Sequence, residues 1–320
     1  MIVEYREFGR LGRISALTLG GGGIGGVWGG TDRAEATATV YAAIDEGITM
    51  LDLAPSYGAG AQAERVVGAA LRRRPAPDVL ITSKVQLPDD EEGDIAGRIR
   101  RSLRDSLARL HRDHLDLVLL HTHLRPDDAV PPKPWVTAWR TYRERVVPEF
   151  ERLRAEGLVR GWGITAVAHP DTVLAALRET PRPDAAQVIV NALGFDGGTT
   201  AFHGTPPAHE AITRSANAHD VAVIGIRAVA AGALTSALDR VLPADDPVAT
   251  EFVRAEAFRK LAADLGESPA ALAHRYALSV PGVATVVLGV KNRTELAECV
   301  AAADRGSLTA EVMAAITTLR

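Results

Sequence analysis

Four polar side chains could move a proton together: Asp52, Tyr57, Lys84 and His121. A tyrosine hydroxyl has an unperturbed pKa of about 10, so it donates a proton poorly at neutral pH. A lysine ammonium nearby lowers that pKa, and an aspartate beside the lysine keeps the ammonium charged and oriented. A neutral histidine can hold a carbonyl oxygen by a hydrogen bond. The set therefore predicts an acid–base device in which Tyr57 is the proton donor.

Each of these residues also has a structural explanation when taken singly, as a turn cap, a rim aromatic, a solvated lysine or a satisfied interior histidine. Their placement favours chemistry, because they lie at or just after the ends of three successive apolar segments, residues 48–54, 78–85 and 115–121. The carboxyl ends of parallel strands meet at one rim of a sheet. We therefore expect the four side chains to converge on that rim.

Short apolar runs alternate with longer amphipathic segments along the chain. Strands are predicted at residues 14–20, 48–54, 78–85, 115–121, 159–165, 185–192, 221–228 and 284–290. Helices are predicted at residues 33–46, 62–74, 94–111, 144–156, 170–178, 208–218, 251–278 (two helices) and 293–304. Strands that alternate with helices run parallel, and eight strands that are apolar throughout suit a closed barrel. We predict an α/β fold, one (β/α)8 TIM barrel domain over residues 1–320.

Two long irregular stretches, residues 122–140 and 235–250, follow the fourth and seventh predicted strands. In a barrel these are loops on the catalytic face, where long insertions usually shape a pocket. The alternative is that they are tolerated surface insertions.

A glycine run at residues 20–26 fits the G-x-G-x-x-G pattern of an open dinucleotide-binding fold directly after the first strand. That pattern requires a helix to open on its last glycine. Here residues 27–31 intervene, and the next helix is expected to begin after an N-cap at Thr31 or Asp32. The barrel is therefore preferred.

The bulk composition excludes several classes of partner. The chain has 36 basic and 40 acidic residues and a formal charge of −4, which is unsuited to nucleic acid or an anionic membrane. Cys299 stands alone, so we expect a buried small side chain and no intramolecular disulfide. Without a signal segment or an apolar run of spanning length, we expect a cytoplasmic monomer. His121 and His123 form a pair without a third ligand, so no metal is expected.

The motifs around these side chains resemble those of the aldo-keto reductases. The pattern G-x-x-x-L-D-x-A-x-x-Y-G runs from Gly47 to Gly58, and ERVVGAALR, ITSK and LDLVLLH follow it. The resemblance extends from about Phe8 to Ala303. It implies a (β/α)8 barrel that binds NADPH, or less often NADH, across its carboxyl face. It also implies that Asp52, Tyr57, Lys84 and His121 are the catalytic tetrad, with Tyr57 as general acid in reduction and, when ionised, general base in oxidation. Glu64 either fixes the surroundings of Lys84 or is a helix-surface acid.

The same resemblance assigns residues to the cofactor. Thr165 stands in for a serine hydroxyl at the nicotinamide carboxamide, whereas Ala166 lacks the family's asparagine amide, and Gln187 matches a carboxamide-binding glutamine. Ile226 would pack on the nicotinamide face, and Arg227 could reach the pyrophosphate. The set expected at the cofactor is Gly22, Gly23, Thr165, Gln187, Ile226, Arg227, Gly289, Lys291, Glu295 and Glu298.

The adenosine end of the cofactor should lie after the last strand. Lys291 and Arg293 offer the positive charge that a 2′-phosphate requires, which favours NADP(H). Glu295 stands where an arginine or glutamine is common, which keeps NAD(H) open.

The substrate, a small carbonyl compound or sugar, would lie above Tyr57 and His121, beside Trp28 and either Trp135 or Trp139. Three functions remain open. The first is reduction of aldehydes or ketones, and the second is the reverse reaction of a sugar 1-dehydrogenase. The third is a non-catalytic, cofactor-binding sensor or regulatory subunit.

Overall fold

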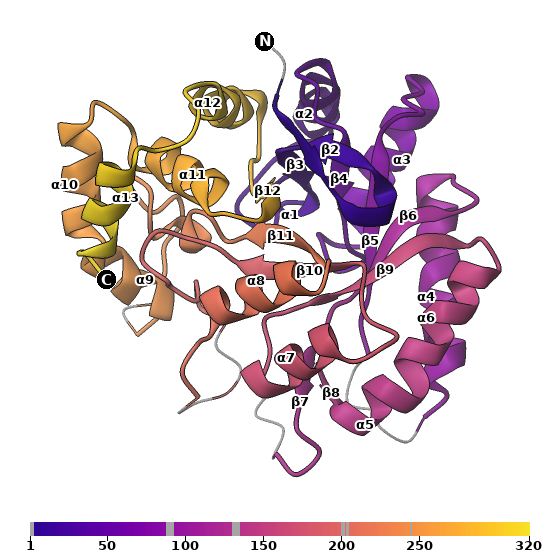
Figure 1. Ribbon diagram of the computed structural model, residues 1–320. Coiled ribbons are helices and arrows are strands. Elements are labelled where there is room, and N and C mark those ends of the chain that lie inside the picture. The colour runs from indigo at the N-terminus through magenta and orange to yellow at the C-terminus, as the bar shows by residue number, and fades with distance from the viewer. Residues whose placement is uncertain (1–2, 88–92, 130–134, 200–201, 203–204, 244) are drawn as a thin grey trace.

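Eight parallel strands close into a barrel in the computed structural model, which describes residues 3–87, 93–129, 135–199, 202, 205–243 and 245–320. The barrel strands are β3 (Leu17–Gly20), β4 (Met50–Asp52), β5 (Leu80–Val85), β6 (Leu115–Leu120), β9 (Val159–Thr165), β10 (Ala185–Ile189), β11 (Ala222–Ile226) and β12 (Val283–Leu288). The ring closes where β12 pairs with β3, with Val286 opposite Leu17. The predicted (β/α)8 TIM barrel is confirmed, and its helices surround the strands (Figure 1).

The outer layer follows the predicted helices closely. It contains α2 (Arg33–Asp45), α3 (Gln62–Arg73), α4 (Ile95–Leu110), α6 (Val147–Ala155), α7 (Pro170–Arg178), α8 (His209–Ala218), α11 (Pro269–Ser279) and α12 (Arg293–Asp304). Helix α4 shows why: Ile95, Ile99 and Leu103 recur at helical spacing and are buried against the barrel. Helix α2 begins at the expected N-cap, since the Asp32 side chain accepts a hydrogen bond from the Glu35 amide.

A hairpin that the sequence pattern did not reveal covers the amino end of the barrel. It consists of β1 (Tyr5–Glu7) and β2 (Arg13–Ser15), joined by the turn Gly9–Leu11. The predicted first strand at residues 14–20 was therefore wrong in its first half, which pairs with β1. Phe8, Leu11 and Ile14 are buried in one apolar cluster with residues of the barrel strands, so they close that end to solvent.

Several segments depart from the predicted pattern of strands and helices. The expected pair of helices at residues 251–278 is three, α9 (Pro247–Arg254), α10 (Glu256–Asp264) and α11, because Asp246 caps a helix that starts earlier and Ser268 caps a new one before Pro269. Residues 139–155 form one helical run, which consists of α5 (Trp139–Thr141), a π-helical turn (Tyr142–Val146) and α6.

The structure also contains short elements that were not predicted. Strands β7 (His123–Arg125) and β8 (Val136–Ala138) pair in the long loop after β6. A one-turn helix α1 (Gly21–Ile24) follows β3, and α13 (Ala310–Thr317) is the last helix before the described residues end at 320.

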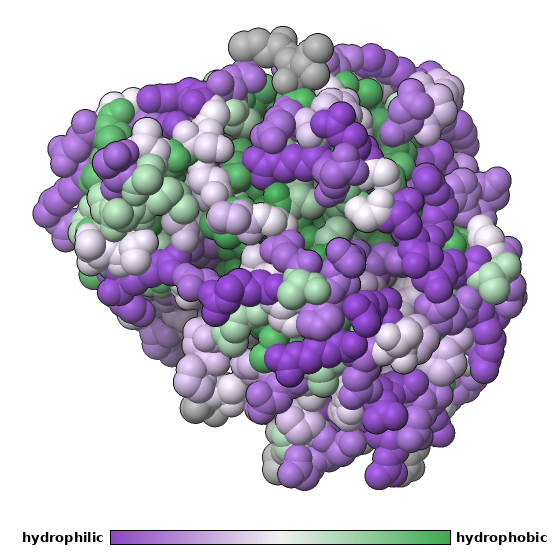
Figure 2. Space-filling model, viewed as in Figure 1, coloured by the Kyte–Doolittle hydropathy of each residue, from purple (hydrophilic) through white to green (hydrophobic). Residues whose placement is uncertain are grey.

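The outer face seen in Figure 2 is mostly hydrophilic, with apolar side chains showing in the recesses between elements. Across the described ranges, no helix combines the length and the apolar character needed to cross a membrane.

Candidate active site

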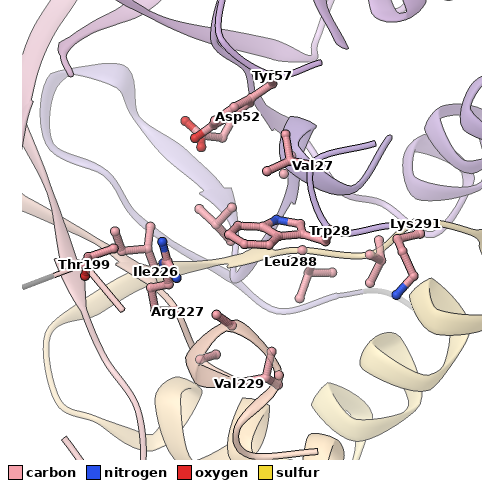
Figure 3. Close-up of a pocket in the computed structure, with 18 of the residues that line it drawn as sticks. Val27, Trp28, Asp52, Tyr57, Thr199, Ile226, Arg227, Val229, Leu288 and Lys291 are labelled. Carbon is pink, nitrogen blue, oxygen red and sulfur yellow. The ribbon is translucent and has the colours of Figure 1, made fainter. Parts of the chain in front are cut away.

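A cavity of about 710 Å³ opens at the carboxyl ends of the barrel strands. Figure 3 shows Asp52 and Tyr57 on one side, Lys291 at another end, and the Trp28 indole between them. The long loop after β11 contributes Asp239 to the cavity wall, which confirms that this insertion shapes a pocket.

Asp52 and Lys84 form a buried ion pair behind this cavity. The Lys84 Nζ donates to Asp52 Oδ1 at 2.7 Å and to the Leu53 carbonyl at 2.8 Å. Gln187 Nε2 donates to the same aspartate oxygen at 2.9 Å. Burial lowers the pKa of Lys84, but the interactions of its ammonium with Asp52 and Tyr57 together outweigh burial and raise that pKa overall. Lys84 is therefore held as an ammonium at neutral pH.

Tyr57 lies directly against that ammonium. The Lys84 Nζ is 4.7 Å from the centroid of the Tyr57 ring. We predicted that Lys84 lowers the pKa of Tyr57, and it does, but burial is the larger effect and raises the pKa of Tyr57 above its usual 10. The expected net lowering was therefore wrong. The hydroxyl stays protonated at neutral pH, so it is available as a donor.

His121 is neutral under all physiological conditions. Burial, aided by the charge of Lys84, lowers its pKa to about 3. Its ring meets the Tyr57 ring edge-on with centroids 6.0 Å apart, and its Nδ1 is buried without a hydrogen-bond partner. The His121 ring and the Tyr57 phenol therefore border the same cavity.

Glu64 is fully buried, so the alternative of a helix-surface acid was wrong. Its two oxygens accept hydrogen bonds from Ser83 Oγ and Arg109 Nε, both at 2.5 Å. Ser83 is the chain neighbour of Lys84, and successive side chains of a strand point to opposite faces. Glu64 thus fixes the outer face of β5 at the residue beside Lys84.

Polar groups suited to an amide lie next to these residues. Thr165 Oγ1 is buried and has no hydrogen-bond partner. The Gln187 side chain lines the same cavity, and Ile226 presents an apolar wall. An unpartnered buried hydroxyl beside a carboxamide and an apolar face fits a nicotinamide ring with its carboxamide. Thr165, Gln187 and Ile226 therefore lie together, with the chemistry that a nicotinamide would need.

Two arginine side chains lie near the Trp28 ring. The guanidinium of Arg227 lies 5.1 Å from the Trp28 ring centroid, and that of Arg240 lies 5.8 Å from it. Gly22 permits this position, because a Cβ there would lie 2.7 Å from the Trp28 indole nitrogen. Gly289 lies beside the same indole.

Gly23, which was expected at the cofactor, lies instead where α1 packs against the chain after β12. Among the described residues that line the cavity, Gly22 is present and Gly23 is not. A Cβ on Gly23 would lie 1.9 Å from the Val290 carbonyl oxygen, so α1 packs directly on the chain after β12.

We expect Gly23→Ala to lower the free energy of unfolding by about 2–3 kcal/mol, because backbone must move to admit the methyl group. Gly30→Ala is the matched control, since its Cβ would meet nothing within 4 Å. Urea denaturation of both variants measures the difference, and equal stabilities would contradict this role of Gly23.

The remaining expected cofactor residues lie at the start of α12. Lys291 forms ion pairs with Asp239 and Glu295, and Arg293 forms one with Glu35. Glu298 accepts a hydrogen bond from Ser268 Oγ at 2.5 Å and also lines the cavity.

Of the two candidate tryptophans in the loop after β6, Trp135 borders the cavity and is 41% exposed. Trp139 stacks on Tyr142 in the helical layer.

The sequence reasoning missed His274 and the cavity position of Cys299, whose sulfur lies 3.8 Å from His274 Nε2. Their only signal was a histidine and a cysteine on neighbouring predicted helices. Within the described ranges, no three histidine, cysteine, aspartate or glutamate side chains cluster closely enough to hold a metal ion.

Comparison with known proteins places this geometry in a family. The model of the Aldo/keto reductase family matches residues 16–320. L-galactose dehydrogenase of Arabidopsis thaliana is 26% identical over 304 residues, covering 94% of this chain and 88% of that protein. The aldo-keto reductase YhdN of Bacillus subtilis is 36% identical over 136 residues, which is 40% of each chain.

Solved structures agree. A glycerol dehydrogenase from Gluconobacter oxydans superposes with a TM-score of 0.70 and 26% identity, covering 98% of this chain and 94% of that chain. A holo-form aldo-keto reductase from Bacillus halodurans shares the fold, with a TM-score of 0.73 over 99% of this chain and 96% of that chain, at 23% identity. The chain therefore belongs to the aldo/keto reductase family and is an NAD(P)H-dependent oxidoreductase.

Proposed function

We propose that this enzyme reduces a small aldehyde or ketone with Tyr57 as general acid. The observation that carries the proposal is that a protonated phenol and a neutral imidazole border one cavity, with a buried ammonium directly behind the phenol. The nicotinamide of the bound cofactor supplies the hydride, and Thr165, Gln187 and Ile226 would hold that ring. Trp28 and Trp135 would border the substrate.

Each member of the tetrad has a separate task. His121, being neutral, donates a hydrogen bond to the carbonyl oxygen and orients the substrate. Negative charge builds on that oxygen as its carbon is reduced, and the oxygen becomes a stronger base than the phenolate of Tyr57. The Tyr57 proton then passes to it, and Lys84 stabilises the tyrosinate that remains. Asp52 keeps Lys84 charged and aimed at the tyrosine.

The reverse reaction, oxidation of a sugar, is the second candidate. It uses the same groups, with ionised Tyr57 as the base. The name of L-galactose dehydrogenase, and that of D-threo-aldose 1-dehydrogenase from Pseudomonas sp, 30% identical over 190 residues, support it. Glu295 beside Lys291 also supports it, because a carboxylate there suits NAD(H), which the dehydrogenase direction commonly uses.

Absorbance of the reduced cofactor, followed with aldehydes and ketones and in reverse with aldoses, tests both candidates. Turnover in the reducing direction supports the first, and turnover with aldoses supports the second. Cofactor binding without turnover on any substrate would favour the non-catalytic subunit over both.

We expect the rate of reduction to show no titration step near the usual histidine pKa. The pKa of His121 is lowered to about 3, so the ring is already neutral across about pH 5–8. Reduction requires protonated Tyr57, whose pKa lies above 10, so kcat/KM for reduction should fall only at strongly alkaline pH, while that for oxidation rises there. A pH profile of kcat/KM in both directions measures this. A step near pH 6.5 that disappears in His121→Asn would contradict the assignment.

A further inference from the structure

At the start of α12, side-chain oxygens of the protein itself already occupy the backbone amides. Three backbone amides there could bind a phosphate, as helix N-termini often do. Lys291 N donates to Glu295 Oε2, Arg293 N donates to Glu35 Oε1, and Glu295 N donates to Asn292 Oδ1, each at 2.9 Å. Side-chain oxygens of the chain therefore take the contacts that a phosphate would use.

The two cations at the start of α12, Lys291 and Arg293, are likewise paired with carboxylates of the protein. Lys291 Nζ lies 2.6 Å from Asp239 Oδ2 and 2.8 Å from Glu295 Oε1. The Arg293 guanidinium binds both oxygens of Glu35, with Nε at 3.1 Å and Nη2 at 2.9 Å. Asp239 also pairs with Arg240 Nη1 at 3.1 Å, so three carboxylates face three cations and each of these cations already has a carboxylate partner.

The cavity connects the start of α12 with the proposed reaction centre. Its lining includes Tyr57 and His121 as well as Lys291, Glu295 and Glu298. Figure 3 shows Tyr57 and Lys291 at different ends of it. A dinucleotide with its nicotinamide at Tyr57 has its adenosine half farther along the same cavity. This step rests on the proposed function, because that function fixes which end of the cavity holds the nicotinamide.

We infer that the enzyme takes NAD(H) in preference to NADP(H), with Glu295 as the residue that determines the choice. A ribose 2′-hydroxyl can donate a hydrogen bond to a carboxylate. A 2′-phosphate would instead face Glu295 and Asp239 at close range, or would have to displace them from Lys291. The NADP(H) preference was expected from the positive charges of Lys291 and Arg293. In the structure both charges are paired with carboxylates.

Calorimetric titration of the protein with NADH and with NADPH tests the inference without relying on turnover. We expect NADH to bind at least about tenfold more tightly, the effect of one unfavourable close charge contact. In Glu295→Gln the preference should shrink severalfold, mainly because NADPH binds more tightly. Glu311→Gln is the matched control, since Glu311 is also an acid in the first turn of its helix but is exposed on α13. That variant should keep the wild-type preference.

The adenosine half alone gives an independent readout. Titration with 5′-AMP and with 2′,5′-ADP compares the ribose hydroxyl with the phosphate in ligands that lack nicotinamide, and we expect the same order of affinity. Tighter binding of NADPH than of NADH, or a preference unchanged in Glu295→Gln, would overturn the inference while leaving the proposed function intact. Failure of both dinucleotides to bind would overturn the proposed function itself.

Discussion

Replacing Tyr57 with phenylalanine should reduce turnover by a factor on the order of 10²–10⁴, the usual contribution of a positioned general acid. The phenyl ring keeps the contact with Lys84, whose Nζ lies 4.7 Å from the ring centroid, and removes only the proton donor. Cofactor affinity should stay within about twofold, because the cofactor contacts proposed above come from other residues. Steady-state kinetics and calorimetric titration of the same preparation measure the two quantities.

Tyr41→Phe is the control for this variant. Tyr41 is half-buried on α2, and its hydroxyl donates to the Ala70 carbonyl at 3.1 Å, away from the cavity. It loses the same hydroxyl group but should retain wild-type turnover. Retention of turnover in Tyr57→Phe would refute Tyr57 as the acid.

Replacing Lys84 with methionine should lower the free energy of unfolding by about 3–5 kcal/mol, since it leaves a buried carboxylate without its cation. Asp52 is 2% exposed, and its remaining partner among the contacts described is the Gln187 amide. Turnover should fall as well, because Tyr57 loses the charge that stabilises its anion. Urea denaturation at neutral pH, with fluorescence or circular dichroism as the probe, measures the stability loss.

Two further variants separate charge from volume. Lys84→Met combined with Asp52→Asn removes the unpaired charge, so it should recover much of the lost stability but none of the activity. Lys260→Met removes an exposed lysine paired with Glu256 at 2.7 Å and should change stability little. If the double variant were no more stable than Lys84→Met, burial of an unpaired charge would not be the cause.

The barrel and the placement of the tetrad could be predicted because both follow from local patterns. Apolar runs of strand length fix where each strand ends, and Asp52, Lys84 and His121 stand at or just past those ends. The hairpin at residues 5–15 could not be predicted in this way, because each of its strands is only three residues long. Short strands carry too little periodicity to be distinguished from loops.

The ion pairs at the start of α12 could not be predicted from the sequence, for a different reason. Asp239 and Lys291 are 52 positions apart and meet only because the loop after β11 folds over the start of α12. Likewise, the sequence placed Lys84 near Tyr57 but could not weigh its charge against the burial of the phenol. That burial is a property of the assembled cavity, and it reversed the expected direction of the pKa.

The indole of Trp28, which has the guanidinium groups of Arg227 and Arg240 close to its ring, gives the protein a built-in fluorescent reporter. Trp162 is fully buried in the core and Trp139 stacks in the helical layer, so neither faces the cavity in the part of the chain described. Trp28 and the more exposed Trp135 do face it. Indole emission responds to nearby charge and to solvent contact, so a ligand that enters between these side chains changes the light that the protein itself emits. Occupancy can then be followed in real time without a label.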